Sequence, residues 1–561
     1  MTRFVGLLCA CLALVGCGGT TQDPSEILHV RADRVVDRNQ KPVWLRGLQF
    51  SNRAYDDRDP AGPDPASTYA DQSDYQRAAA MGVNTIAFFL RSDQFEVDAA
   101  PYQYLASGFD WLDQNIAWAR ASGIRLILTL LGTPGTPQWQ TTCDGNSVWD
   151  VPAYQDRTIA LWQALSARYA NEPVIAGYNP LTDPVPSGPV EQWHSLAKRL
   201  VSAIRKVDLH HLVVIEIPAG SNCAYRANSG ADLFRVPDPN VLYAFAADVP
   251  WEYVAQQLPS QGLGDGGSYP DETQLLDANF LEWQHNSWDS TPTESQLALS
   301  PGDTSWTEQR FVYRVTDPNY QVAAPVLQSN YNLGKVYFDD FTVNEYDQDL
   351  NFVRTVFDVD IEEGSGPWDL YQGNDDGSEC PDCGAVSALE PEAHRGKASI
   401  SLSGTTSQAT LSNDRFLFPA KLNYTYELKG WIKGENSSPK NASRFRFDFS
   451  KYDGAVPGFL PLRNRDGLSW YLQSFIDWGK EQQVPLYVHE FFAGRPTFSD
   501  DKGGLLWVED MIELLKASNC HFAYKEYRSD EVGVYSEALD LSDPATVNQP
   551  LIDLLTRELT Q

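Results

Sequence analysis

The stretch SDYQRAAAMGVNTIAFFL, residues 73–90, contains the change of period that decides the fold. Its first half, 73–81, has the 3.6-residue period of an amphipathic helix, and its second half, 83–90, has the pattern of a β-strand. A helix that runs directly into a strand is the repeating unit of α/β proteins with a parallel sheet.

The same alternation continues on both sides of this stretch. Strands are expected at 43–48, 83–90, 125–131, 174–178, 211–217, 241–246, 485–490 and 521–527, and helices at 73–81, 109–121, 153–169, 190–206, 468–481 and 504–517. Eight parallel-type strands with helices between them predict an α/β chain folded as a (β/α)8 TIM barrel. Residues 27–37 predict a small hairpin that closes its bottom.

The alternation breaks for about 200 residues after the sixth strand. Short β-patterned segments at 310–315, 334–343, 398–403, 424–432 and 444–449 are separated by Gly, Asn, Asp and Ser turns, which indicates an inserted antiparallel β-sandwich. We therefore expect barrel strands 1–6 in 27–261, the sandwich in 262–465 and barrel strands 7–8 in 466–561. An insert after strand six would lie at the C-terminal mouth, where barrel active sites lie.

The N-terminus predicts export. Arg3 precedes a short apolar run at 4–15, and the chain then reads Leu14-Val15-Gly16-Cys17, which resembles a bacterial lipobox. We expect 1–17 to be a lipoprotein signal peptide, Cys17 to be lipidated, and 18–26 to be a tether. Gly18 follows the cysteine in place of an Asp that would retain the protein at the inner membrane, so the outer membrane is the expected location, facing the periplasm or the cell surface. The alternative is an ordinary signal peptide with a chance cysteine.

Composition narrows the class of ligand. The formal net charge of −32 argues against nucleic acid, which needs a basic surface, and suits an exported protein that acts on neutral ligands. Export permits disulfides, so Cys380 and Cys383 are expected to form a local disulfide, since a zinc site would need two further ligands. Cys143 is a candidate partner for Cys223, and Cys520 is expected to be a buried free thiol.

Several short motifs lie at the expected strand ends in a particular order. They are WLRG (44–47), MGVNT (81–85), GFDWLD (108–113), AGY (176–178), PLYVHEF (485–491), DKGG (501–504) and WVEDM (507–511). In this order the barrel halves resemble glycoside hydrolase family 5, which includes cellulases, mannanases and related retaining enzymes. That resemblance implies a β-linked polysaccharide or oligosaccharide as ligand and no cofactor for the barrel.

The insert carries a resemblance of its own. GKVYFDD (334–340) and GKASI (396–400) resemble pieces of a galactose-binding-like carbohydrate-binding module, in an order that suggests circular permutation. Such modules often hold a structural calcium, and Asp340 is the best single ligand candidate because calcium prefers carboxylates and carbonyls. The alternative is a plain solvated acidic pair, Asp339 and Asp340.

Two carboxyls are expected to carry the chemistry of a retaining glycosidase. The family's nucleophile ends strand seven, and Glu490 has that place. Its acid is the Glu of an Asn-Glu-Pro at the end of strand four, which here reads Thr182-Asp183-Pro184, so Asp183 keeps a carboxyl that is one methylene shorter. The alternative role for Asp183 is a loop carboxylate that caps the next helix.

The family's other polar positions are altered. Ala87 has the place of the nucleophile-orienting Arg, Leu131 that of the strand-three His, Thr182 that of the Asn, Ala246 and Asp248 those of the His and Tyr of strand six, and Lys525 that of the aromatic platform. Losing one positioned group typically costs about 10²–10³ in rate. The sequence therefore favours a glycan-engaging surface lipoprotein whose ordinary hydrolysis is weakened or lost, with Glu490 held in an ion pair by Lys525.

Two alternatives stay open. One is an active retaining β-glycosidase that uses Glu490 and Asp183 with new helpers such as Glu216, Asp248 or Lys525; the other is a partner-binding surface lipoprotein. Sugar binding needs aromatic faces for the C–H surfaces of pyranose rings, although most tryptophans are core residues. The substrate-binding candidates are Trp139, Trp149, Trp251, Lys525 and Asp248 in the barrel, with Trp306, Trp368 and Trp431 in the insert.

Overall fold

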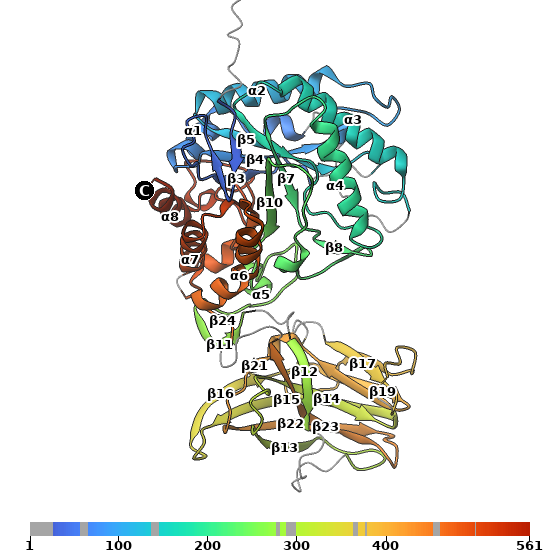
Figure 1. Cartoon of the computed structure of the whole chain (residues 1–561). Coiled ribbons are helices and arrows are strands. Elements are labelled where there is room, and N and C mark those ends of the chain that lie inside the picture. Colours follow the sequence, from blue (N-terminus) through green and yellow to red (C-terminus); the bar gives the residue numbers. More distant parts are fainter. Residues whose placement is uncertain are drawn as a thin grey trace, which may run out of the picture.

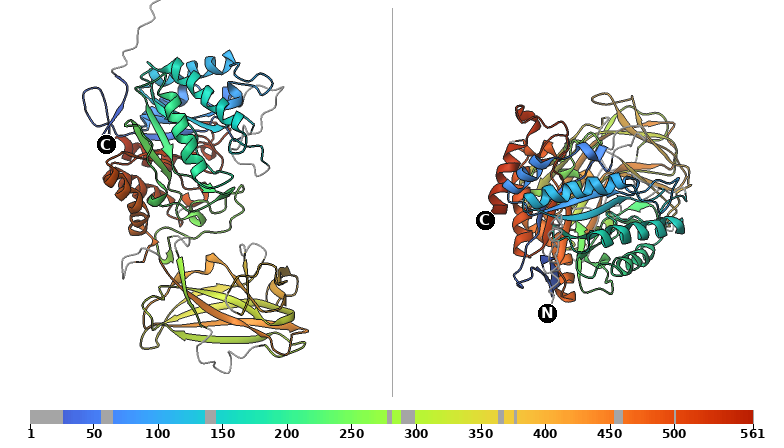
Figure 2. Two further views of the ribbon diagram at one scale, coloured as in Figure 1. Left: turned by 45° about the vertical axis from the view of Figure 1, so that its right-hand side comes forward. Right: turned by 90° about the horizontal axis from the view of Figure 1, so that it is seen from above.

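The computed structural model describes residues 26–55, 65–135, 145–276, 281–287, 299–362, 368–375, 378–452, 460–499 and 501–560. These residues form two lobes, a barrel surrounded by helices and a β-sandwich (Figure 1), and the lobes remain distinct from a second direction (Figure 2, left). The expected signal peptide and Cys17 lie outside the described residues. Among the helices that are described, none is both long and apolar enough to cross a membrane.

Eight parallel strands close into a barrel, as the alternation of periods predicts. In barrel order they are β3 (Arg46–Phe50), β4 (Thr85–Arg91), β5 (Arg125–Gly132), β6 (Ile175–Asn179), β7 (Leu212–Glu216), β10 (Val241–Ala246), β25 (Leu486–Phe491) and β26 (His521–Tyr524). β26 pairs with β3 and completes the ring. The fold prediction of a TIM barrel is confirmed, and β1 (His29–Arg31) pairs with β2 (Arg34–Val36) as the expected hairpin.

Helices connect and cover these strands. They are α1 (Gln72–Ala80), α2 (Ala106–Ala121), α3 (Pro152–Tyr169), α4 (Glu191–Ile204), the short α5 (Trp251–Val254), α6 (Arg465–Gln482), α7 (Gly504–Ala517) and α8 (Gln549–Thr560). The turn from α1 into β4 needs glycine, because Gly82 has φ +85° and a Cβ there would lie 2.7 Å from the Leu559 carbonyl carbon of α8. The stretch that predicts the fold is therefore also held by the last helix of the chain.

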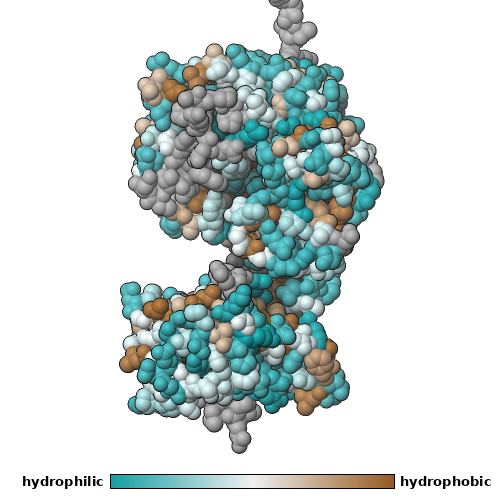
Figure 3. All heavy atoms as spheres, turned by 180° about the vertical axis from the view of Figure 1, so that it is seen from behind, coloured by the Kyte–Doolittle hydropathy of each residue, from teal (hydrophilic) through white to brown (hydrophobic). Residues whose placement is uncertain are grey.

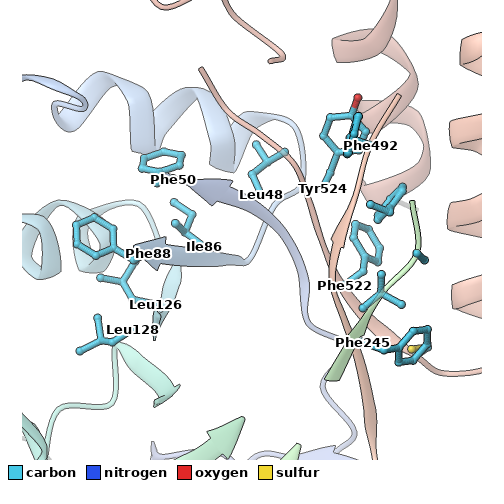
Figure 4. Close-up of a cluster of buried hydrophobic side chains, with 14 of the residues drawn as sticks. Leu48, Phe50, Ile86, Phe88, Leu126, Leu128, Phe245, Phe492, Phe522 and Tyr524 are labelled. Atoms are coloured by element: carbon cyan, nitrogen blue, oxygen red, sulfur yellow. The ribbon is translucent and has the colours of Figure 1, made fainter. Parts of the chain in front are cut away.

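The barrel has two apolar layers. The larger one lies between strands and helices, and Figure 4 shows part of it around Leu48, Phe50, Ile86 and Phe88. The smaller one fills the barrel interior with side chains that include Leu45, Phe89, Ile127, Leu212 and Tyr487. The strands are thus buried on both faces, as parallel strands in α/β proteins usually are.

The insert consists of two antiparallel sheets packed face to face around a Phe-rich core. One sheet contains β12 (Leu281–Asn286), β23 (Ala442–Tyr452), β14 (Val322–Asn330), β20 (Gln408–Ser412) and β17 (Asp369–Gly373), with β21 (Phe418–Pro419) on β14. The other contains β13 (Thr307–Arg314), β22 (Thr425–Glu435), β15 (Asn332–Tyr346), β19 (Ser399–Thr405) and β18 (Val386–Glu390), with β16 (Phe352–Val359) on β15. The predicted inserted sandwich is confirmed.

A short ladder joins the two lobes. β11 (Asp271–Leu275) pairs with β24 (Leu462–Arg463), so the chain leaves the barrel and returns to it through one antiparallel pair. Beside this ladder, Tyr452 of the sandwich contacts Trp470 of α6, with ring centroids 5.6 Å apart. The face of the molecule shown in Figure 3 is mostly hydrophilic, with small hydrophobic areas scattered over both lobes.

The cysteines follow the expected pattern where they are described. Cys380 and Cys383 form a disulfide, and Cys520 is a buried free thiol, so both predictions are confirmed. Cys223 is disulfide-bonded, whereas Cys143, its expected partner, lies outside the described residues.

Removing the insert tests the independence of the barrel. Leu276 donates its backbone N–H to the carbonyl of Pro461 at 3.0 Å, so a short Gly-Ser linker can join these residues and delete 277–460 while the β11–β24 ladder is kept. We expect a soluble barrel that melts cooperatively a few degrees below the full chain, because Trp470 loses Tyr452; about 2–4 °C is expected per kcal/mol lost. Calorimetry and circular dichroism measure this. A truncated chain without a cooperative transition would show that the barrel needs the insert.

Candidate active site

The carboxyl ends of four barrel strands bring a cluster of charged side chains together. Asp183 follows β6, Glu216 ends β7, Glu490 lies in β25 and Lys525 follows β26. This end of the strands is where barrel enzymes place their reacting groups. Residues separated by more than 300 positions in the sequence therefore meet at one mouth.

A β-bulge in β25 determines how this strand presents its polar residues. The register with β10 shifts between Phe245 and Ala246, and the register with β26 shifts between Val488 and Phe491. In a regular strand His489 and Glu490 would point to opposite faces, whereas a bulge re-aims one of them. Both side chains consequently make contacts at the barrel mouth.

Glu490 is held by a cation and an amide donor. Its Oε1 lies 2.7 Å from Lys525 Nζ, its Oε2 accepts a hydrogen bond of 3.3 Å from Gln49 Nε2, and the residue is 7% exposed. Burial alone would raise the pKa of this carboxyl, but Lys525, His489 and the hydrogen bonds outweigh it and lower the pKa below its ordinary value. Glu490 is therefore an ionised carboxylate at neutral pH, and the expected ion pair with Lys525 is present.

Lys525 is itself surrounded by groups that favour its charge. Its Nζ lies 5.4 Å from the ring centroid of Phe492 and 5.9 Å from that of Tyr55. Burial would lower the pKa of the ammonium group, but Glu490, Tyr55 and Asp248 raise it well above the ordinary value. The cation is fixed beside the carboxylate by both charge and ring contacts.

Asp248 is the second carboxyl near Glu490. Burial, the charge of Glu490 and a hydrogen bond with Glu490 raise the pKa of Asp248 well above its ordinary value, although Lys525 opposes this. This shift favours the protonated form of Asp248, which can donate a hydrogen bond to Glu490. Its Oδ1 is buried without a hydrogen-bond partner among the described residues.

Asp183 adopts a left-handed backbone conformation with φ +47°. Its backbone N–H donates to Glu216 Oε2 at 2.7 Å, which holds this conformation in place. Burial and the charge of Glu490 raise the pKa of Asp183 to about 7, with Lys525 opposing. Two facing carboxyls thus have opposite preferences: Glu490 favours the ionised form and Asp183 the protonated form.

Glu216 and His489 both contact Asp183. Glu216 accepts a hydrogen bond from Asn179, and His489 Nε2 lies 3.4 Å from Glu216 Oε2 and 3.8 Å from Asp183 Oδ1. Burial raises the pKa of Glu216 to about 7, with His489 opposing. Atoms of Asp183, Glu216 and His489 lie within 4.8 Å of one another, a spacing that a metal ion tolerates. Within the described residues, His489 Nε2 already lies close to the carboxylates of both Asp183 and Glu216, so the three side chains contact one another without a metal ion.

Three of the altered family positions, Ala87, Leu131 and Ala246, offer no polar side chain to Glu490. Ala87 and Leu131 belong to the interior apolar layer, and Thr182 is 1% exposed. Ala246 pairs with Glu490 across the neighbouring strand and offers it no polar group. Polar help for Glu490 comes instead from Lys525, Asp248 and Gln49.

The tryptophan candidates separate clearly. Trp149 is 4% exposed and packs edge-on against Trp193 in the core, so its burial counts against a role in sugar stacking. Trp251 is 41% exposed and contacts Phe492 edge-on at 6.0 Å, next to Lys525. Trp139 lies outside the described residues. Trp251 is therefore the barrel tryptophan best placed for a sugar ring.

In the sandwich, the other aromatic candidates are engaged with neighbours. Trp431 stacks on His394 with centroids 3.8 Å apart, Trp306 contacts the same histidine, and Trp368 packs on Phe416. Asp340 pairs with His394 at 2.5 Å and Arg395 at 2.8 Å, and it lies close to Asp339 and Asp360. A calcium ion would have to compete with Arg395 for these oxygens, and the calcium site stays a prediction.

Sequence reasoning missed Gln49 and His489. Gln49 Nε2 donates to the carbonyl of His489 at 2.8 Å as well as to Glu490, so it ties β3 to β25 at the mouth. A polar residue inside the otherwise apolar strand β3 is the signal that identifies it. His489 lay beside Glu490 in a quoted motif. Alternation from the interior residue Tyr487 already turns His489 to the barrel interior, and the bulge brings Glu490 to the same side.

Comparison with known proteins adds a family to this geometry. Residues 36–290 match the family model "Cellulase (glycosyl hydrolase family 5)". The barrel belongs to glycoside hydrolase family 5.

Curated relatives of this family 5 barrel are matched over short segments. A β-xylosidase of Phanerodontia chrysosporium is 32% identical over 144 residues, which is 24% of this chain and 29% of that protein. Endoglucanase C of Acetivibrio thermocellus is 22% identical over 192 residues, 34% of this chain and 53% of that protein. The chain thus covers less than two thirds of the length of these relatives.

Solved structures of similar architecture include Cel5A of Thermotoga maritima with cellobiose. It aligns at 12% identity with a TM-score of 0.46, over 91% of this chain and 96% of that chain. The same enzyme with mannotriose aligns with a TM-score of 0.45.

Proposed function

We propose that this family 5 barrel is a retaining β-glycosidase in which Glu490 is the nucleophile and Asp183 the general acid. The observation that carries the proposal is the division of charge between the two carboxyls at the barrel mouth. Lys525 keeps Glu490 ionised, while Asp183 retains its proton up to about pH 7. A nucleophile and an acid whose environments separate their pKa values are what this chemistry requires.

The groups that contact Glu490 come from other strands than the family pattern predicts. The resemblance leads us to expect a cation after strand two, where Ala87 stands, but Lys525 after strand eight supplies one at 2.7 Å. Protonated Asp248 supplies a further hydrogen-bond donor. The loss of family residues is thereby offset by donors that reach the same carboxylate, which favours turnover over the weakened hydrolysis expected from the sequence.

In the proposed reaction, Glu490 attacks the anomeric carbon and the glycosidic bond breaks. Asp183 gives its proton to the leaving oxygen, and then, as a carboxylate, it accepts a proton from the water that releases the sugar from Glu490. Lys525 must yield part of its contact with Glu490 as that carboxylate forms the covalent bond, and Asp248 and Tyr55 remain nearby to accommodate the ammonium group.

The substrate we propose is a neutral β-linked glycan. One of the curated relatives is named a β-xylosidase and another an endoglucanase. Trp251 offers an exposed aromatic face beside the catalytic residues, and the buried ring of Phe492 supports it edge-on. Exposed Tyr225 lies close enough to Asp183 and Glu490 for their charges to add to the effect of burial and raise the pKa of its hydroxyl.

Hydrolysis by the natural protein and two substitutions test the assigned roles. We expect the mature chain to hydrolyse a β-glucan, mannan or xylan with retention of the anomeric configuration. NMR of the released sugar identifies the anomer that forms first. Asp183→Asn should lower glycan hydrolysis by about 10²–10⁴ because no proton reaches the leaving oxygen. The same variant should keep most activity on dinitrophenyl β-glycosides, whose leaving group needs no acid. Glu490→Gln should lose both activities.

Glu481→Gln on the exposed surface of α6 is the matched control and should behave like the natural protein. If no glycan is cleaved while Glu490→Gln keeps its affinity in glycan gels, the barrel binds without turnover and the proposal is wrong. Absence of both cleavage and retardation would instead favour a surface lipoprotein that binds a protein partner.

The pH profile of kcat/KM follows from the same two carboxyls. The rate should fall as the pH rises through about 7, because Asp183 loses the proton it must donate. At low pH, kcat/KM should fall only below the ordinary pKa of a glutamate side chain, because Lys525 lowers the pKa of Glu490. Lys525→Met should move this acid limb to higher pH and cost about 10–10³ in rate. An acid limb unmoved by Lys525→Met would contradict the role of the ion pair.

We place the enzyme at a bacterial membrane, anchored through lipid on Cys17 with the outer membrane as its expected site. The lipobox-like Leu14-Val15-Gly16-Cys17 supports this placement. Growth with radiolabelled palmitate should label the natural protein and leave Cys17→Ser unlabelled, with Cys9→Ser labelled as the control. A mature protein with an unmodified N-terminus in mass spectrometry would contradict the anchor.

A further inference from the structure

A cavity lies between the two lobes, and the catalytic carboxyls are not among the residues that line it. Its volume is about 460 Å³, within the range of small-molecule sites. The barrel side of its lining consists of Glu252 in α5, the glycine-rich 262–267 loop and the β11–β24 ladder. The sandwich side consists of Phe357 of β16, Asp369 of β17 and the turn η7 (Asp414–Phe416) with its flanking residues. Neither lobe forms this cavity alone.

Arg463 of β24 adds a cation to the cavity wall. It is 7% exposed, and its Nη1 donates to the carbonyl of Gly266 at 2.5 Å. Its Nε has no hydrogen-bond partner among the described residues and is itself closed off from the cavity. The side chain lies close enough to Asp271 and Glu252, which also line the cavity, for their charges to act on the pKa of its guanidinium.

The rest of the lining combines hydrogen-bond acceptors with aromatic rings. Carboxylates of Glu252, Asp369 and Asp414 are close enough for the first two to raise the pKa of Asp414, in addition to the effect of its burial. Phe357 and Phe416 provide ring surfaces, with centroids 5.5 Å apart. Hydroxyl groups donate to carboxylates and C–H faces pack on rings, so this mixture suits a neutral sugar.

Consecutive residues of α5 belong to the catalytic mouth and to the cavity. Trp251, the first residue of α5, contacts Phe492 next to Lys525, and the following residue, Glu252, lines the cavity. A glycan that stacks on Trp251 would therefore lie one residue along this helix from the cavity wall.

We infer that the junction cavity is a second glycan-binding site, which takes neutral sugar units of the same β-linked polysaccharide that occupies the mouth. The inference rests on the proposed function for its substrate class. It gives the sandwich a role in retaining a polymer, through the turn 414–416 rather than through its aromatic cluster around His394.

Binding and turnover are measured separately to test this. In the inactive Glu490→Gln background, affinity gels with the hydrolysed polysaccharide should show at least a tenfold weaker dissociation constant for Asp369→Ala/Asp414→Ala, and for Gln274→Trp, which fills the cavity. In the active chain the same changes should raise KM for the polymer while kcat/KM for a short aryl glycoside stays unchanged. All three positions are partly or fully exposed, so their substitution leaves both cores intact.

Trp283→Ala is the control, because Trp283 is a sandwich residue that is 57% exposed and lies outside the cavity lining. Unchanged polymer affinity in both cavity variants, or a loss confined to Trp283→Ala, overturns the junction site. If the natural chain cleaves nothing but the cavity variants still lose polymer affinity, the junction site stands and only the proposed hydrolysis fails.

Discussion

The contact between Lys525 and Glu490 is the interaction on which the chemistry of this barrel depends. It joins two neighbouring strands at 2.7 Å and leaves Glu490 ionised in a buried place, where an isolated carboxylate would take up a proton. The negative charge kept on Glu490 is in turn a reason why Asp183 and Asp248 hold their protons. Burial is the main cause of the raised pKa values of Asp183 and Asp248, and the charge on Glu490 adds to it. Lys525 acts directly against both shifts, so it favours the protonated form of these two carboxyls only through the charge that it keeps on Glu490.

Barrel geometry explains why a cation that follows a different strand can still contact Glu490. All eight strands converge on one mouth, so side chains that follow strand two and strand eight reach the same carboxylate. The interior layer has adjusted accordingly: Ala87 is small and buried where a long cation is expected from the family pattern. An Arg at Ala87 in the present chain would compete with Lys525 for Glu490 and with the packing of that layer, so the two arrangements exclude each other.

Much of the fold was predictable because it depends on period and order. The β10 bounds agree residue for residue with the expected 241–246, and β5 differs by one residue at its end. Family offsets also brought Asp183, Asp248, Glu490 and Lys525 to one site. Three features were not predictable from the sequence pattern: the bulge that turns Glu490 to the same side as His489, the αL conformation of Asp183, and the burial of Trp149 against Trp193. None of these has a local signature, because each is imposed by neighbours distant in the sequence.

The position of the insert gives the last step of the argument. A sandwich inserted after strand six lies between β10 and the helix α6, which leads to the nucleophile strand β25. In α5, Trp251 contacts Phe492 at the mouth and the next residue, Glu252, lines the junction cavity. The β11–β24 ladder contributes Gln274 and Arg463 to the same lining before α6 begins. The ladder that joins the two lobes is therefore also part of the wall of the proposed second site.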